Sequence, residues 1–341
     1  MSKDLAGSFR RAAGAFAAAL ALGMPAVAAA EVDEVTIVRQ FGIHYLPLVM
    51  MEHDKLIEKH ARANGIKLEV KWAQLSGGAS VNDALLSGAV DFSAGGVGPL
   101  IVLWDRSQGG KGDVKAVAAV SDVPMTLVTR NPNIKSVADF TEKDKIALPA
   151  VKTSMQAVTL QMAAAKLWGD ANYTRLDRFT VSMRHPDATA SMLSGGGEIN
   201  SHFTAAPFDF QQLKQPGFHA VLDSYDVYGG QATLILLYAA KKFVEANPTV
   251  VKSVVAALGE ADELIRKDRR RAAEIYLKVT RNKTSVEDMV TMLENPKIAF
   301  RLEPSATYPV AEFLHKIGRL NNKPSSWKDL FFPIAHQRGG S

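Results

Sequence analysis

The chain of 341 residues contains no cysteine. Disulfide bonds, thiolate metal sites, a thiol nucleophile and a lipoprotein anchor on cysteine are therefore excluded. The Gly-x-Ser-x-Gly, His-Glu-x-x-His and Walker-type motifs of common enzyme classes are also missing. His53 and His60 are seven residues apart without a supporting carboxylate, which is not a metal-ligand spacing. We therefore expect no metal, no cofactor and no enzyme of these classes.

A strong excess of one charge is lacking too. The formal net charge is +5, and it falls to +3 without the first thirty residues, which carry three basic side chains and one acidic one. Such a mildly basic balance argues against nucleic-acid binding. The basic run 266–271 is typical of a solvated helical face, although docking against a membrane protein stays open for it.

The N-terminus has the pattern of an export signal. A basic start that includes Arg10 and Arg11 precedes an apolar segment over residues 12–27, and three alanines at 28–30 suit cleavage before Glu31. This segment is short and alanine-rich for a membrane anchor. We therefore expect a signal peptide over residues 1–30, cleaved near Ala30-Glu31, and a periplasmic protein. The Sec route fits better than Tat, but the sequence does not separate them.

Beyond the signal, short apolar strands alternate with helices, which is typical of an α/β fold with largely parallel sheet. The length suits two lobes. A first series of elements ends near Pro124, and a second runs from Met125 until the chain returns near Gly229. We predict lobe I from residues 31–124 and 229–341, lobe II from 125–228, and two hinge crossings between them. The expected elements are strands at 34–41, 67–72, 89–94, 114–120, 125–129, 145–148, 178–183, 199–203 and 233–240, and helices at 46–63, 154–168, 186–193, 204–213, 248–258, 270–279, 285–293 and 307–317.

Residues 73–99 are the most informative segment. A loop with Ser76, Gly77 and Gly78 precedes a short helix, and a second glycine loop before Pro99 opens another helix. Two helix N-termini behind glycine loops offer free N–H groups and positive dipole ends, which suit an anion or another polar ligand. This segment therefore predicts a binding site rather than a catalytic one.

Several motifs recur in the order of a known family. They are Gly42–Pro47, Ser76–Gly78, Ala84–Phe92, Ile134–Phe140 and Ile146–Pro149. In these motifs the chain resembles the periplasmic substrate-binding proteins of nitrate/sulfonate/taurine-type ABC importers, which share their fold with thiamin-pyrimidine synthesis proteins. The resemblance extends over residues 34–280. It implies a two-lobed type II periplasmic binding protein that closes over a small solute and delivers it to a membrane permease, acting as a monomer.

In this family, and by the general rule for open α/β sheets, ligand contacts come from loops at the carboxyl ends of strands. In lobe I these are Gln40, Phe41, His44, Tyr45, Ser76, Gly77, Gly78, Gly96, Val97 and Gly98. In lobe II they are Thr153, Ser154, Met155, Gln156, Arg184, His185, His202, Phe203 and Thr204. Asp122 and Tyr225 lie at the crossings, where they either touch the ligand or brace the hinge.

Each candidate also has a plain structural interpretation. The glycines suit ordinary turns, Arg184 suits a surface loop, and His202 suits a hydrogen-bonded core histidine. Lys152, Arg184 and the histidines at 44, 185 and 202 outnumber acidic candidates such as Asp122. On this count we expect an anionic or zwitterionic solute, with Arg184 pairing to it and Asp122 as partner of any amine.

The leading hypothesis is import of an alkanesulfonate or taurine-like solute without turnover. The alternatives are an aromatic or aliphatic carboxylate, nitrate or a pyrimidine thiamin precursor as solute, or a sensory co-receptor role. An enzyme of the thiamin-pyrimidine type would need a cysteine-rich motif, which this chain lacks.

Overall fold

Two five-stranded sheets organise the computed structural model, which describes residues 30–109 and 112–341. The predicted signal peptide lies outside the described residues except for Ala30. Glu31–Ser341 form one compact unit. Within the described residues, no helix combines the length and apolar character that crossing a bilayer requires.

The first sheet contains an antiparallel strand between parallel ones. Its order is β2 (Glu69–Gln74), β1 (Glu34–Arg39), β3 (Phe92–Gly96), β10 (Ile235–Ala240) and β4 (Val114–Ser121). β1 runs parallel to β2 and β3, whereas β10 runs antiparallel to both β3 and β4. The apolar run that predicts a buried strand at 233–240 thus forms an interior strand of this sheet.

The second sheet repeats this plan. Its order is β7 (Thr180–Ser182), β6 (Ile146–Leu148), β8 (Ser201–Thr204), β5 (Thr126–Thr129) and β9 (His219–Asp223). β6 is parallel to β7 and β8, and β5 is antiparallel to its neighbours β8 and β9. The predicted α/β class with flanking helices is therefore confirmed. Each sheet is mixed, because β10 in the first and β5 in the second run against the other four strands.

Helices cover both sheets. Around the first sheet they are α1 (Leu46–Asp54), α2 (Leu56–Ala63), α3 (Gly78–Leu86), α4 (Val97–Ser107), α9 (Lys241–Ala246), α10 (Pro248–Lys267), α11 (Arg269–Thr280), α12 (Val286–Leu293), α13 (Thr307–Lys316) and α14 (Pro333–His336). Around the second they are α5 (Met155–Trp168), α6 (His185–Ser194), α7 (Phe208–Leu213) and α8 (Ser224–Tyr228). Short 3-10 helices lie at Ile43–Tyr45, Val137–Asp139, Asp170–Asn172, Asp177–Phe179 and Trp327–Leu330.

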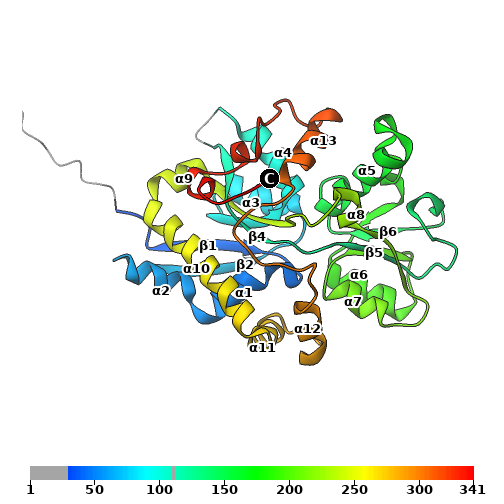
Figure 1. Cartoon of the computed structure of the whole chain (residues 1–341), viewed down its shortest axis with the longest axis horizontal. Coiled ribbons are helices and arrows are strands. Elements are labelled where there is room, and N and C mark those ends of the chain that lie inside the picture. The colour runs from blue at the N-terminus through cyan, green and yellow to red at the C-terminus, as the bar shows by residue number, and fades with distance from the viewer. Residues whose placement is uncertain (1–29, 110–111) are drawn as a thin grey trace, which may run out of the picture. The chain divides into compact units, whose positions relative to one another are not determined.

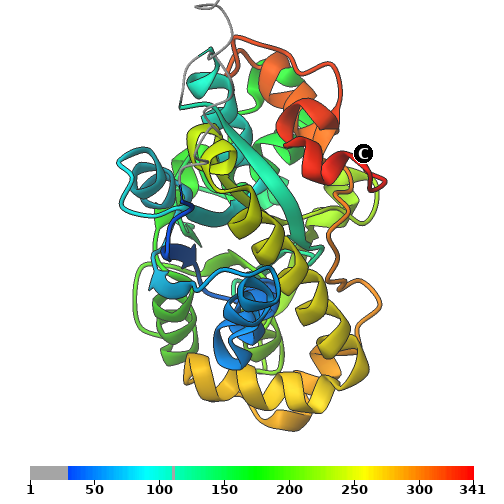
Figure 2. The same ribbon diagram turned by 90° about the vertical axis from the view of Figure 1, so that its left-hand side faces the viewer.

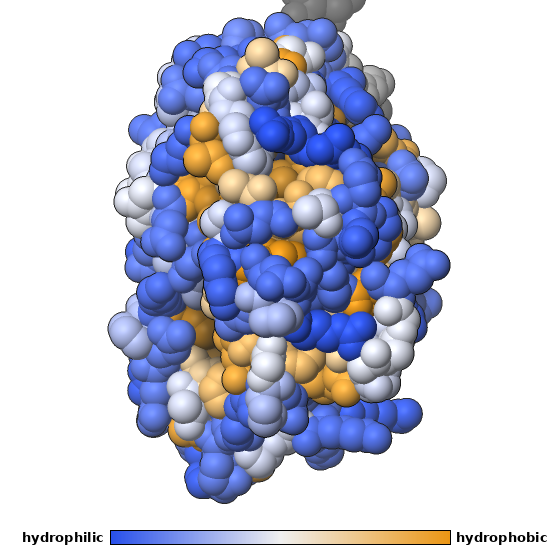
Figure 3. Space-filling model, turned by 90° about the vertical axis from the view of Figure 1, so that its right-hand side faces the viewer, coloured by the Kyte–Doolittle hydropathy of each residue, from blue (hydrophilic) through white to orange (hydrophobic). Residues whose placement is uncertain are grey.

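The helices form layers on the sheets. Figure 1 shows α5 and α8 on one side of β5 and β6, and α6 and α7 on the other. Figure 2 shows α10 running diagonally beside α1 and α2, with which it packs. On the side of the second sheet, hydrophilic residues cover most of the surface, and apolar residues come through in separate patches (Figure 3).

Helix ends follow the local sequence. Ser154 caps α5, because its hydroxyl oxygen accepts from the N–H of Ala157 at 3.3 Å. The start of α10 is capped from a distant part of the chain: the carboxylate of Glu31 accepts from the N–H groups of Thr249 and Val250 at 2.9 and 2.8 Å. An acidic group at this end also suits the helix dipole.

Several expected elements differ in the structure. The helix expected over 204–213 begins only at Phe208, because β8 extends through Thr204. The helix expected over 46–63 is broken at Lys55, whose φ of 51° is left-handed, so α1 and α2 are separate. The strand expected from residue 89 starts only at Phe92. Ala89 instead closes the capping turn after α3, because its N–H donates to the carbonyl of Ala84 at 3.0 Å and Gly88 has a φ of 72°.

The chain passes between the sheets after β4 and returns before β10, and a third segment accompanies these passages. Asp122 pairs with Ala299 through two backbone hydrogen bonds of 2.8 and 2.9 Å. The fully buried Asp122 carboxylate also accepts from the hydroxyls of Thr233 and Ser305, at 2.8 and 3.1 Å, and forms an ion pair with Arg301. Burial raises the pKa of Asp122, and these donors oppose the rise. Asp122 therefore joins all three segments.

Replacing Arg301 with Met should destabilise the protein, because the Asp122 carboxylate would stay buried without its countercharge. We expect the free energy of unfolding to fall by about 2–4 kcal/mol, toward the low end for buried pairs because the Arg301 side chain is partly exposed. Urea unfolding would measure this loss. Adding Asp122→Asn should recover much of it, because a neutral amide can accept from the Thr233 hydroxyl through its oxygen and donate to the Ser305 hydroxyl through its nitrogen. A double variant no more stable than Arg301→Met alone would contradict the ion-pair interpretation.

Candidate ligand-binding cleft

A cavity of about 40 Å³ lies where loops of the two sheets meet. We call it the central pocket. Its lining residues are Gln40, Phe41, His44, Tyr45, Ser76, Gly78, Gly96, Pro99, Pro149, Ser154, Met155, Gln156, His185, Leu234 and Ile235. The structure thus brings together a large share of the candidates that the sequence offers in both predicted lobes.

Four helices begin at this pocket. Gly78 is the first residue of α3, Gly96 precedes α4, Ser154 precedes α5, and His185 is the first residue of α6. The first N–H groups of a helix have no partner inside the helix. Neither Gly77 nor Gly96 supplies a side-chain cap. The lining therefore combines several positive helix ends and amide donors.

Glycine allows the two sheets to approach each other here. A Cβ on Gly96 would lie 2.9 Å from the Cβ of Met155, which is closer than real side chains come. The N–H of Gly98 faces the Sδ of Met155 at 3.3 Å. Near the other edge, the N–H of Ile43 donates to the carbonyl of Ala206 at 2.9 Å. These contacts hold the loops of both sheets together around the pocket.

Gln40 positions the glycine loop of α3. Its amide nitrogen donates to the Tyr45 hydroxyl at 2.9 Å and to the Ala94 carbonyl at 3.3 Å, and its amide oxygen accepts from the N–H of Gly77 at 3.0 Å. Burial raises the pKa of Tyr45, so this hydroxyl stays neutral. Gln40 therefore orients neighbouring donors as well as lining the pocket.

A chain of neutral side chains leads from the pocket into the second sheet. The Gln156 amide lies 3.2 Å from Nε2 of His185, and His185 Nδ1 lies 2.9 Å from Nε2 of His202 and 3.0 Å from the Thr204 hydroxyl. His202 Nδ1 lies 2.8 Å from the Gln212 amide. Burial lowers the pKa of His185 to about 3 and that of His202 well below its usual value.

Neutrality makes these residues act as a unit. A neutral imidazole has one donor and one acceptor nitrogen, so the direction of the His185–His202 hydrogen bond fixes what each ring offers at its other nitrogen. Gln156 is the end of this chain that lines the pocket. His202, Thr204 and Gln212 thus control how Gln156 and His185 present donors or acceptors to a ligand, although they do not line the pocket.

His44 has a different character. It is buried in the pocket lining, and its Nδ1 has no hydrogen-bond partner within the described residues. Burial, aided by His185, lowers the pKa of His44 to about 3. A buried polar nitrogen without a partner is costly unless a ligand or water supplies one. His44 is therefore a neutral group with unused hydrogen-bonding capacity beside the pocket.

Other candidates lie outside the lining. The Val97 N–H donates to Leu234, Thr153 lines a neighbouring cavity, and Phe203 is a fully buried core side chain. Asp122 has the bracing contacts described above, and the Tyr225 hydroxyl donates to the Lys297 carbonyl at 2.9 Å. Both residues at the crossings thus have the contacts of the bracing alternative.

Arg184 is exposed, and its guanidinium binds the Asp187 carboxylate through two hydrogen bonds of 2.7 and 3.1 Å. Its guanidinium carbon also lies 5.8 Å from the ring centre of Phe41, which lines the pocket. Lys152 does not line the pocket, and the three histidines are buried. The lining contains no Arg, Lys, Asp or Glu. The excess of basic over acidic candidates counted in the sequence is therefore not found in the lining of this pocket.

Sequence reasoning missed Pro99, Pro149, Leu234 and Ile235 as lining residues. For the last two the reason is strand direction. β10 is antiparallel, so its amino end lies at the edge where the parallel strands β1 and β3 have their carboxyl ends. A search restricted to carboxyl ends could not find them.

A larger cavity of about 880 Å³ adjoins the central pocket through shared lining residues Gln40, Phe41 and Tyr45. We call it the outer pocket. Phe208 and Phe210 add aromatic surface to it, and its charged members include Arg39 and Lys214, which pair with Glu52 and Asp288. The two pockets together could hold a polar head and a bulkier body.

Known proteins share this architecture. The model of the NMT1-like family matches residues 28–277. The Escherichia coli (strain K12) protein named "Putative aliphatic sulfonates-binding protein" is 24% identical over 235 residues, which are 68% of this chain and 67% of that protein.

Solved structures agree in fold. The alkanesulfonate-binding protein SsuA from Xanthomonas axonopodis pv. citri bound to MOPS superposes with a TM-score of 0.67 at 20% identity, over 86% of this chain and 96% of that one. The periplasmic nitrate-binding protein NrtA from Synechocystis PCC 6803 gives a TM-score of 0.67 at 14% identity, over 91% and 86%. The chain belongs to the NMT1-like family and has the fold of periplasmic binding proteins.

Proposed function

We propose that this protein is the periplasmic solute-binding component of an ABC importer, and that it captures a small organic anion of the sulfonate class without turnover. The signal-like N-terminus, the family and the relatives that bind sulfonates or nitrate support this role. The protein acts as a monomer. It closes residues 31–124 with 229–341 against 125–228 and hands its solute to the membrane permease.

The observation that carries the proposal is a binding pocket with donors and no charged side chain. Helix starts converge on the central pocket, and its histidines are neutral. An anion would be held by backbone amides and helix dipoles. Neutral donors also leave the ligand without a tight countercharge, which suits a carrier that must release its cargo.

Binding requires the loops to separate first. A space of about 40 Å³ holds about three water molecules at roughly one per 10–15 Å³, which is too little for an organic sulfonate. Opening would break the Ile43–Ala206 hydrogen bond and the Gly98–Met155 contact. Closure over a solute would bring these groups back toward each other, with the head of the solute at the helix starts and its body in the outer pocket. This is hinge motion of the kind common in two-lobed binding proteins.

The outer pocket supports a second candidate ligand class. Phe41, Phe208 and Phe210 offer aromatic surface next to the polar pocket, which suits the ring of an aromatic carboxylate or sulfonate. In both cases the anionic head lies at the helix starts and the body extends outward.

A thermal-shift screen of residues 31–341 tests the ligand class. The panel contains alkanesulfonates, taurine, nitrate, aromatic acids and pyrimidines. A ligand that binds only the folded state raises the melting temperature with its concentration, so we expect shifts with sulfonates. Shifts with aromatic acids alone would move the assignment to the second class. Shifts with pyrimidines but no anion would contradict an anion receptor.

Ser154 gives a charge-specific test of the binding geometry. Asp and Asn are both good helix caps and have nearly the same shape, so Ser154→Asp and Ser154→Asn differ in charge alone. Calorimetric titration with the sulfonate from the screen should show that Ser154→Asp binds it roughly tenfold more weakly than Ser154→Asn, or weaker still. The reason is that the new carboxylate competes with the sulfonate at the start of α5. Equal affinities would place the anion elsewhere.

Neutral histidines predict a distinctive pH dependence. Because the pKa values of His44 and His185 are about 3, sulfonate affinity should be flat from pH 8 to pH 5. An affinity that rises as the pH falls through 6.5 would instead reveal a cationic histidine partner.

Stability should behave differently in the same range. The unfolded chain protonates these histidines near pH 6.5, while the folded protein keeps them neutral. The contribution of these histidines to the free energy of unfolding is therefore fully present above pH 6.5 and declines as the pH falls toward 3. Urea unfolding at pH 7.5 and pH 5 should show this decline, and Gln in place of His185 should reduce it.

A further inference from the structure

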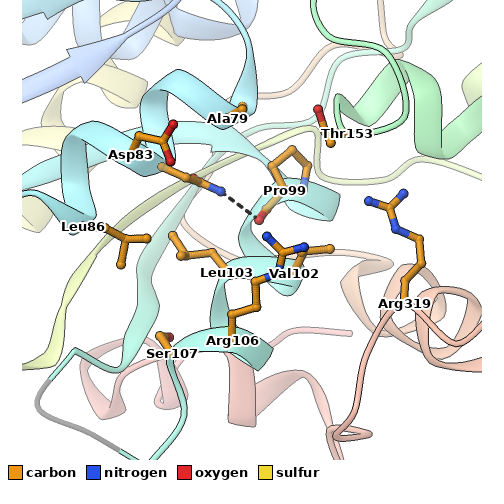
Figure 4. A pocket seen from close by; sticks show the side chains of 12 residues that line it. Ala79, Asp83, Leu86, Pro99, Val102, Leu103, Arg106, Ser107, Thr153 and Arg319 are labelled. Atoms are coloured by element: carbon orange, nitrogen blue, oxygen red, sulfur yellow. Dashed lines mark hydrogen bonds between the residues drawn. The ribbon is translucent and has the colours of Figure 1, made fainter.

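A separate cavity of about 190 Å³ lies between α3 and α4 (Figure 4). We call it the arginine pocket and define it by Arg106, Arg319, Thr153, Leu86, Leu103 and Pro99. Four segments build it: the consecutive helices α3 and α4, the residue two positions before α5, and the loop after α13. It shares Gly78 and Pro99 with the central pocket, but its remaining lining is different.

Two guanidinium groups give this pocket its charge. Arg319 is half-buried and held in place, because its Nη1 donates to the Lys152 carbonyl at 2.6 Å and to the Gln161 amide oxygen at 3.3 Å. Both hydrogen bonds use Nη1, so the other N–H groups of the fork are available. Within the described part of the chain, neither Arg106 nor Arg319 forms an ion pair.

The two positive charges affect each other. Burial lowers the pKa of Arg319, Tyr173 and Asp177 oppose this effect, and Arg106 adds to it. An arginine stays protonated in any case, so the repulsion between the two guanidinium groups is not relieved by proton loss. Asp83 also lines the pocket, but Figure 4 shows it on the side opposite Arg319. An anion between the arginines would relieve this repulsion.

Much of the remaining wall is apolar, and Asn82, Asp83 and Ser107 add polar groups to it. Leu86, with 57% exposure, is one of the large apolar side chains on the surface, and Pro99 and Leu103 continue the apolar wall next to it. Figure 4 shows these side chains together with the guanidinium of Arg106. The space is smaller than the roughly 300 Å³ at which pockets for drug-sized ligands begin. A suitable occupant is therefore small, with one charged end and one apolar end.

We propose that the arginine pocket binds a second small organic anion, separately from the solute of the central pocket. Its carboxylate, sulfonate or phosphate head lies between Arg106 and Arg319, where a guanidinium fork pairs well with such groups, and the Thr153 hydroxyl is a further donor. Its apolar body lies against Leu86, Leu103 and Pro99. Because Thr153 immediately precedes the cap of α5 and Arg106 belongs to α4, an occupant also links the two sides of the cleft.

Weakening the central pocket with Ser154→Asp helps to separate the two sites. In the Ser154→Asp protein, calorimetric titration with hexanesulfonate, hexanoate and hexyl phosphate should still show one binding event. Adding Arg106→Gln or Arg319→Gln should weaken that event by roughly tenfold or more. Arg62→Gln, which removes an exposed cation on α2, is the matched control and should have no effect.

The outcomes distinguish this inference from the proposed function. An Ser154→Asp protein that binds none of the three probes, or whose binding both arginine variants leave unchanged, overturns the second site. Equal binding of hexanesulfonate by the Ser154→Asp and Ser154→Asn proteins contradicts anion binding in the central pocket, but it does not contradict the second site. Arg106 is exposed, so its variant should fold. If Arg319→Gln melts early, Arg319→Lys takes its place; it keeps the charge but not the fork, and it should bind the probes with intermediate affinity.

Discussion

The close contact between the glycine-led start of α4 and Met155 at the start of α5 is the constraint on which the cleft depends. Gly96 has no room for a Cβ against Met155, and the N–H of Gly98 faces the Met155 sulfur. Since both groups belong to helix starts, the approach that brings the sheets together also places the positive ends of two helices side by side. Packing and ligand recognition are thus consequences of the same contact.

Around this contact, burial turns candidate charges into neutral hydrogen-bonding groups. His44, His185 and His202 cannot ionise cheaply where they lie, since burial lowers the pKa of each. The polarity of the site is therefore set by the direction of the hydrogen bonds along the chain formed by Gln212, the two histidines and Gln156. Residues that never touch a ligand can in this way decide whether it meets a donor or an acceptor.

Sequence alone could predict the fold well, because strands and helices alternate with clear periodicity and glycine or proline marks their ends. It also identified much of the central lining, since most of those residues follow parallel strands. It could not identify Leu234, because nothing local reveals that β10 runs antiparallel. Nor could it tell that Arg184 pairs with Asp187 while His185, the next residue, is buried: that difference depends on which side of α6 faces β8.

The position of β10 has a consequence for the order of assembly. All strands of the second sheet come from one continuous stretch, from β5 to β9, so they are complete before the chain reaches α8. The first sheet, in contrast, has β10 between β3 and β4, which do not pair directly with each other. A chain that ended at Gly230 would keep every strand of one sheet and split the other into a β2-β1-β3 ribbon and a solitary β4. The sheet whose strands are synthesised first is therefore the last to have all its strands.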